Sequence, residues 1–177
     1  MRNIFSFDAE ANGLWGEPFS IAAVVLSHSG EKLDQFLGRC PISAAPTDWV
    51  KENVLPAMDD IPETYGSYTA LLKDFSVFYM KHKDTADTVV YIGGIVESGI
   101  LWDMHEAGLI GEYDAPFPVH DVSGRLEQAG EDPTSLEEYR IRYHIDISDL
   151  SKRAHNPVYD AALAARVYLH LLARVSG

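Results

Sequence analysis

Apolar residues near the start of the chain form short runs of the kind found in β-strands. Residues 3–9, 18–28 and 32–39 are such runs, and the second is rich in β-branched side chains. Ser29-Gly30-Glu31 supplies a turn between the last two runs. Short apolar runs that are separated by turn-forming residues are typical of hairpins. The pattern predicts three consecutive strands in an antiparallel meander.

The apolar pattern then changes to helical spacing. Residues 47–55 predict a short helix that stops at Pro56. Residues 64–82 predict a longer helix, because large apolar side chains recur on one face: Tyr68, Leu71, Leu72, Phe75, Phe78 and Tyr79. A last helix is expected to begin at Pro157, with Asn156 as its N-cap, and to continue through Leu172.

Between these helices the sequence predicts a β/α unit. Residues 88–92 form a short apolar strand, and Gly93-Gly94 leads into a helix that ends near Gly108. The pattern from 109 to 154 is weaker and predicts only a loop over 114–118 and a short helix over 121–129. Strands followed by alternating elements favour an α/β fold, in which an antiparallel meander followed by parallel strands forms a mixed sheet with flanking helices.

The composition is that of a folded protein. The 177 residues, of which 46% are hydrophobic and 23% charged, suit a single domain over 1–177. Cys40 is the only cysteine, so an intrachain disulfide and a cysteine-rich zinc site are excluded. The longest apolar stretch, 21–26, is too short to cross a bilayer. We therefore expect a cytoplasmic protein with no membrane partner.

The net charge limits any interaction with nucleic acid. A formal charge of -13 should repel long polyanions, because unaided phosphate binding relies on lysine and arginine. One short segment carries four basic residues: Arg140, Arg142, Lys152 and Arg153. That segment is either a local phosphate contact or an ordinary solvated surface. The charge therefore favours short or single-stranded oligonucleotides as partners.

Two pairs of acidic residues indicate a metal site. Asp8 and Glu10 follow an apolar run, and residues i and i+2 of a strand point to the same side. Glu97 shares its helix face with Ile100 and Leu101. Asp160 likewise shares a face with Leu163, Val167 and Leu171 of the last helix.

Buried carboxylates cost several kcal/mol unless they are paired or bind a metal. If all four meet at one sheet edge, they suit a two-metal site with Mg²⁺ or Mn²⁺. The alternative for Glu97 and Asp160 is that each is an ordinary acid in the first turn of a helix. His155, just before the last helix, could act there as a general base; a solvated or structural histidine is the alternative.

The order of these residues resembles the DEDDh family of 3′-to-5′ exonucleases, which have a ribonuclease H-like fold. The segment from Asp8 to Leu14, read as Asp-Ala-Glu-Ala-Asn-Gly-Leu, is similar to the family's first motif, D-x-E-x-x-G-L. His155 to Asp160 is similar to its last motif, H-x-x-x-x-D. The resemblance implies a ribonuclease H-like mixed sheet, with Asp8, Glu10, Glu97 and Asp160 as metal ligands and His155 as the base.

The middle motif departs from the family pattern. Where the family has His-Asn, an apolar pair and Asp, this chain reads Ile92-Gly93-Gly94-Ile95-Val96-Glu97. Glu97 keeps the charge but moves the oxygens by about one methylene, and a misplacement of that order can cost roughly 100-fold in rate. Asp103 and Asp121 are alternative candidates for the missing ligand, with Glu97 preferred.

The resemblance also implies a substrate and a pocket. The activity is the release of nucleoside 5′-monophosphates from the 3′ end of RNA or DNA, with Gly13, Leu14 and Trp15 beside the terminal nucleotide. Alternatively, Leu14 or Trp15 packs into the core. A catalytically weakened module that binds nucleic-acid ends, and a nucleotide phosphohydrolase, are the alternative functions. Several relatives are dimers, and the sequence leaves open whether this chain forms a homodimer.

Overall fold

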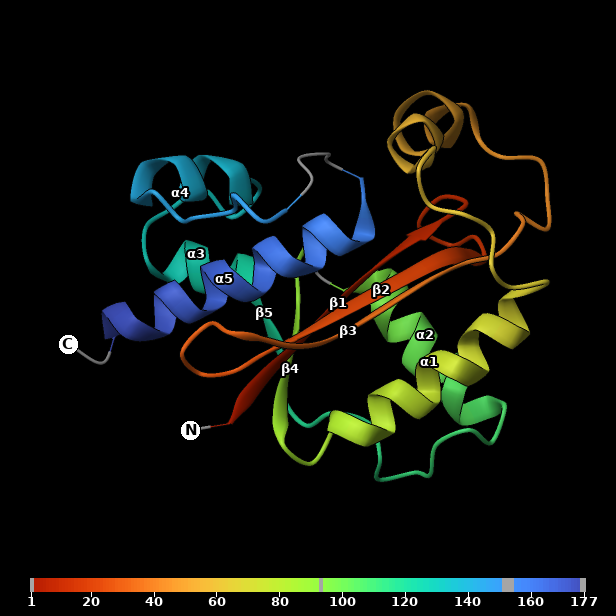
Figure 1. Cartoon of the computed structure of the whole chain (residues 1–177), viewed down its shortest axis with the longest axis horizontal. Helices are drawn as coiled ribbons and strands as arrows, with labels where there is room; N and C mark the ends of the chain where they lie inside the picture. The colour runs from red at the N-terminus through yellow and green to blue at the C-terminus, as the bar shows by residue number, and fades with distance from the viewer. Residues whose placement is uncertain (1, 93, 151–154, 176–177) are drawn as a thin grey trace.

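A five-stranded mixed sheet forms the centre of the computed structural model, which describes residues 2–92, 94–150 and 155–175 (Figure 1). The strands are β1 (Asn3–Ala11), β2 (Pro18–Leu26), β3 (Lys32–Arg39), β4 (Ala86–Val90) and β5 (Val119–Asp121), in the spatial order β3-β2-β1-β4-β5. β1, β2 and β3 pair antiparallel, whereas β4 is parallel to both β1 and β5. The predicted meander followed by parallel strands is confirmed.

The helical elements are η1 (Val50–Val54), η2 (Leu55–Met58), α1 (Tyr68–His82), α2 (Ile95–Glu106), α3 (Val122–Gln128), α4 (Leu136–Tyr143) and α5 (Pro157–Val175). The Ser67 hydroxyl accepts a hydrogen bond from the Ala70 N–H and caps α1. The Asn156 side chain accepts from the N–H groups of Val158 and Tyr159, as expected for the N-cap of α5.

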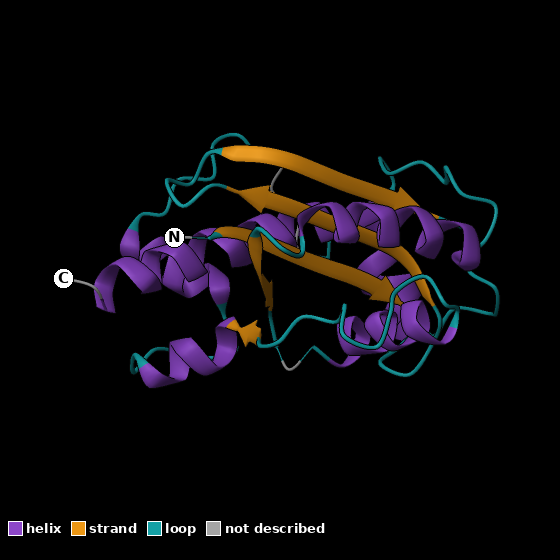
Figure 2. Ribbon diagram, turned by 90° about the horizontal axis from the view of Figure 1, so that it is seen from below, coloured by secondary structure: helices purple, strands orange, loops and turns teal. Residues whose placement is uncertain are grey.

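Alternate residues of β1 contribute to two cores, one on each face of the sheet. Phe5 and Phe7 belong to the core that contains α1 and α2, and Phe75 of α1 is buried there. Ile4 belongs to the opposite core, which contains α3, α4 and α5. Helices therefore cover both faces of the sheet, as Figure 2 shows from a second direction.

α5 lies close against β1 and β2 because its inner face carries small side chains. Ala161, Ala164 and Ala165 are all buried in this interface. The short side chains bring the backbone of the helix near the strands. The first turn of α5 therefore lies beside the end of β1, where the acidic motif is located.

Two expectations for the local structure were wrong. The short helix predicted over 47–55 was expected to stop at Pro56, but the helical backbone continues through Met58. Pro56 is tolerated there because it lies in the first turn of η2, where no N–H donor is needed. The weakly patterned segment 109–154 contains β5 and α4 in addition to the predicted short helix. Gly93, Lys152 and Arg153 lie outside the described residues. Within the described part of the chain, no helix combines the length and apolarity required to cross a bilayer.

Candidate active site

The end of β1 directs two carboxylates toward α5. Ile4 of β1 packs into the core that contains α5, and strand alternation places Asp8 and Glu10 on that same face. The pairing of β1 with β2 becomes irregular between Glu10 and Ala11, so the strand departs from regular pairing directly after the acidic pair. The predicted same-side arrangement is therefore present.

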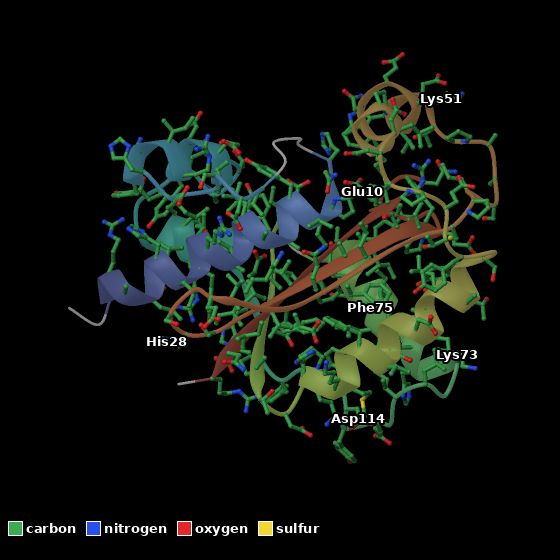
Figure 3. All side chains as sticks on the ribbon, in the orientation of Figure 1. Glu10, His28, Lys51, Lys73, Phe75 and Asp114 are labelled. Carbon is green, nitrogen blue, oxygen red and sulfur yellow. The ribbon has the colours of Figure 1, made fainter. Side chains whose placement is uncertain are left out.

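Three carboxylates meet at this point. One oxygen from each of Asp8, Glu10 and Asp160 lies within 4.8 Å of the other two. Figure 3 shows Glu10 between the end of β1 and the start of α5. Clustered carboxylate oxygens are the ligands that hard divalent cations prefer. The geometry of the described residues therefore fits a metal ion.

Burial and neighbouring negative charges raise the pKa of all three acids. Burial raises the pKa of Asp8 well above its usual value, and the charges of Asp160, Glu10 and Glu97 add to this. Burial, together with the charges of Asp160 and Glu97, raises the pKa of Glu10 to about 8. Burial raises the pKa of Asp160 to about 7, although a hydrogen bond from the His155 N–H opposes the shift. A bound cation would remove this repulsion.

Glu97 adjoins the cluster without being one of its three members. The side chain is 7% exposed, as predicted for an inward-facing residue of α2. Its carboxylate accepts hydrogen bonds from its own N–H and from the Ala9 N–H, and burial raises its pKa to about 7. Its charge raises the pKa of both Asp8 and Glu10. A role for Glu97 as a metal ligand stays a prediction.

The two alternative ligands have other partners. Asp103 accepts a hydrogen bond of 2.7 Å from the Tyr68 hydroxyl. Asp121 caps α3 by accepting from the Ser123 N–H at 2.9 Å. Its charge raises the pKa of Glu97, but it is not part of the three-carboxylate cluster. The choice of Glu97 over these two residues stays a prediction.

His155 lies next to the cluster at the beginning of α5. It is partly buried, and its backbone N–H donates to the Asp160 carboxylate. The imidazole meets the indole of Trp49 edge-on, with 5.2 Å between ring centroids and an interplanar angle of 86°. This location is compatible with a general base, which stays a prediction.

The turn after β1 exposes the residues that were predicted to contact substrate. Gly13 has a positive φ of 85°, and its N–H donates to the Ala11 carbonyl. Leu14 is 64% and Trp15 is 89% exposed, so the alternative that they pack into the core is wrong. Gly13 and Leu14 line a pocket of about 460 Å³ with Glu10, Thr47, Trp49 and Val96 among its other walls.

Two residues at the site were not found from the sequence. The Asn12 amide donates to the Ala45 carbonyl at 3.1 Å and accepts from the Thr47 N–H at 2.9 Å. These bonds attach the segment that leads to Trp49 to the acidic motif. Asn12 lies inside that motif, which was a usable signal, whereas nothing local connects Trp49 with His155.

The two described arginines of the basic segment have ion-pair partners within the chain. Arg140 forms an ion pair with Glu137, and Arg142 forms one with Glu131. Both guanidinium groups are therefore engaged by acids of the same chain, in agreement with the solvated-surface alternative.

Comparisons with known proteins agree with this architecture. No family model matches the sequence, and no curated protein matches it significantly. Among solved structures, the chain is similar to the nuclease domain of 3′hExo, described as a DEDDh family member bound to rAMP. The TM-score is 0.65 at 17% identity, over 97% of this chain and 91% of that chain. The protein therefore has the ribonuclease H-like fold of a DEDDh nuclease domain.

Proposed function

We propose that the protein is a metal-dependent 3′-to-5′ exonuclease that acts on short or single-stranded RNA or DNA and releases nucleoside 5′-monophosphates. The observation that carries this proposal is the meeting of Asp8, Glu10 and Asp160 within 4.8 Å of one another. This cluster lies in a fold that is shared with a nuclease domain. Fold alone does not define an activity, so the argument depends on the site.

The carboxylates suit divalent cations, which we propose to be two Mg²⁺ or Mn²⁺ ions. Asp8, Glu10 and Asp160 would hold them, with Glu97 adding negative charge and completing the predicted ligand set. When bound, such ions supply an activated water and stabilise negative charge on the leaving oxygen. Without them, the raised pKa values favour protons on the same oxygens.

The chain's own residues would provide proton transfer and positioning. His155 is proposed to accept a proton from the attacking water, since histidine is the side chain that most often acts as a general base. The 460 Å³ pocket beside Glu10 is of a size that accommodates a small ligand and would receive the terminal nucleotide. The similar nuclease domain was solved with rAMP, which supports a nucleoside monophosphate as the product.

The charge distribution supports short substrates. The described arginines of the basic segment are paired with glutamates, so few cations remain to follow a long phosphate backbone. Binding that neutralises few phosphates depends weakly on salt. A steep decline of affinity with salt would contradict this part of the proposal.

The direct test is digestion of matched RNA and DNA oligonucleotides that are labelled at the 5′ end, with Mn²⁺ or with a chelator. The expected result is a ladder that shortens from the 3′ end, released 5′-monophosphates, and no reaction in chelator. An oligonucleotide with a blocked 3′ end is the matched control. Cleavage of the blocked substrate, or undiminished activity in chelator, would overturn the proposal.

One observation favours a catalytically weakened binding module as the second candidate. The Glu97 carboxylate is engaged by two backbone N–H groups and lies outside the three-carboxylate cluster. A module of this kind would bind oligonucleotide ends without hydrolysing them in Mn²⁺. A nucleotide phosphohydrolase would instead release phosphate or pyrophosphate from free nucleotides, so product analysis separates the three functions.

A further inference from the structure

Trp49 lies between two parts of the site. It lines the apolar pocket together with Glu10, Leu14 and Val96. Its indole also meets the imidazole of His155 edge-on at 5.2 Å. Perpendicular aromatic pairs at this separation are attractive and have a preferred geometry. One side chain therefore contacts both the pocket and the proposed base.

The backbone around Trp49 is held firmly, although the indole itself is 55% exposed. The next residue, Val50, is fully buried, as are Val54 and Met58 further along the same helical turns. The bonds from Asn12 to Ala45 and Thr47 attach the preceding segment to the end of β1. The neighbours of Trp49 anchor this segment of the backbone. The exposed indole is therefore available for another role.

His155 is constrained at its backbone and much less so at its ring. Its φ of 62° is left-handed, and its N–H is bound by the Asp160 carboxylate. Among the described residues, the ring contact that the structure records for His155 is the one with Trp49. The indole of Trp49 is therefore the described ring that is in a position to limit the direction of the imidazole.

We propose that Trp49 is a positioning residue, which orients His155 toward the carboxylate cluster and makes that orientation depend on occupation of the pocket beside Glu10. A nucleobase in the pocket packs against the indole, restricts its movement and thereby restricts the imidazole. This inference deepens the proposed function and rests on it for its kinetic consequence. Reacting groups lose rate steeply when they are misplaced, so the effect should appear in kcat.

The kinetic test is a double-mutant cycle with Trp49→Ala and His155→Ala, assayed with Mn²⁺ and a short oligonucleotide. Trp49→Ala should lower kcat about 10-fold and raise KM less, because it loosens a catalytic group. Trp49→Phe should restore most of kcat, since it keeps an aromatic ring. In the His155→Ala background, Trp49→Ala should cause no further loss of kcat. An equal loss in both backgrounds, or a Phe variant as impaired as the Ala variant, would overturn the inference.

A second measurement does not require turnover. The imidazole signals of the metal-free protein are followed by NMR while adenosine 5′-monophosphate is added. The His155 signal should shift in the wild type and in Trp49→Phe, and should not respond in Trp49→Ala. His82, whose ring lies 4.9 Å from that of Phe78, is the control signal and should stay unchanged.

The two measurements separate the possible failures. A His155 signal that responds through Trp49 in a protein without nuclease activity would refute the proposed function and support the positioning role. A His155 signal that responds equally in Trp49→Ala, or not at all in the wild type, would refute the positioning role. Because the indole is largely exposed, all variants should keep the thermal stability of the wild type.

Discussion

Acidic side chains in two regions of this protein have opposite electrostatic surroundings. Asp34 on β3 lies 2.7 Å from the Lys81 ammonium and 2.9 Å from the His82 ring, and the bond from Lys81 lowers its pKa to about 2. Asp8, Glu10 and Asp160 lie together; burial raises the pKa of all three, and the charge of Asp160 raises those of Asp8 and Glu10 further. No ion pair recorded among the described residues involves these three acids.

The difference shows how an acidic chain distributes its charge. Asp34 is neutralised by the Lys81 ammonium of its own chain, which stabilises the ionised form. The cluster at the end of β1 must instead be neutralised by protons or by cations from solution. A bound cation would release the repulsion within the cluster, and the raised pKa values are the reason why we treat it as the candidate functional site.

The largest effect is expected from Asp8→Asn. Removing one carboxylate from the cluster should lower nuclease activity about 1,000-fold, because a metal contributes several kcal/mol to the transition state. Initial rates on a 5′-labelled oligonucleotide in Mn²⁺ provide the measurement. Asp34→Asn is the matched control, since it also removes one negative charge, and it should keep full activity. Equal activity of the two variants would show that the cluster is no more important for activity than Asp34.

His155→Ala should lower kcat about 100-fold, a typical contribution of a general base. Binding of Mn²⁺, measured by calorimetry, should change little because the carboxylates remain in place. Unchanged kcat would show that His155 is a structural residue. Loss of metal binding together with activity would show that the substitution disturbs α5.

The third prediction concerns the stability of the protein in chelator. Glu10, Asp160 and Glu97 have folded pKa values of about 8, 7 and 7, above those of the unfolded chain. The folded state therefore binds more protons, so the free energy of unfolding should fall as pH rises from about 4 to 8. The free energy of unfolding should fall by at least a few kcal/mol over this range, since one pKa unit corresponds to about 1.4 kcal/mol.

Urea denaturation at several pH values would measure this dependence, with Asp8→Asn as the reference. The variant should show a shallower decline, and Mn²⁺ should stabilise the wild type most at high pH. His120 and His170 have lowered pKa values and oppose the trend, but they occur in both proteins and cancel in the difference. Equal slopes for the two proteins would contradict the prediction.

Trp15→Ala should weaken oligonucleotide binding about 10-fold, because stacking on one base contributes roughly 1–3 kcal/mol. The melting temperature should not change, since Trp15 is 89% exposed. Trp102, also an exposed tryptophan, offers a control variant, because it lines neither the 460 Å³ pocket nor the smaller pocket of about 220 Å³ that Trp15 lines together with Leu14. Equal losses of affinity in both variants would indicate nonspecific binding.

The smallest effect is expected from Asp34→Asn on stability. A surface ion pair contributes at most about 1 kcal/mol, so urea denaturation at pH 7 should show a loss within that limit. Because the folded pKa of Asp34 is lowered, its contribution is present above about pH 4 and disappears as pH falls toward 2. The difference between wild type and variant should therefore be smaller at pH 2 than at pH 7, and a larger difference at pH 2 would contradict the prediction.

Local patterns were sufficient for the elements that carry the site. The meander and α5 follow from apolar periodicity and from the Asn156 cap, which are properties of neighbouring residues. β5 and α4 were missed because they are short and weakly patterned. β5 has only three residues, and it is a strand because β4 lies beside it.

Part of the candidate site could likewise be predicted from local patterns in the sequence. The same-side placement of Asp8 and Glu10 depends only on strand alternation, and the inward placement of Glu97 depends on its helix face. The bond between the Glu97 carboxylate and the Ala9 N–H joins α2 to β1. No spacing within either element reveals that bond.

Periodicity along the chain could establish which acids face inward, because a strand or a helix sets the direction of each side chain over a few residues. Tertiary packing decided which of them come within 4.8 Å, and it brought Trp49 against His155. These distances depend on how closely α5 approaches the sheet, and therefore on the alanines of one element meeting the strands of another. How closely two elements pack depends on both of their surfaces. The sequence of either segment alone therefore does not predict it.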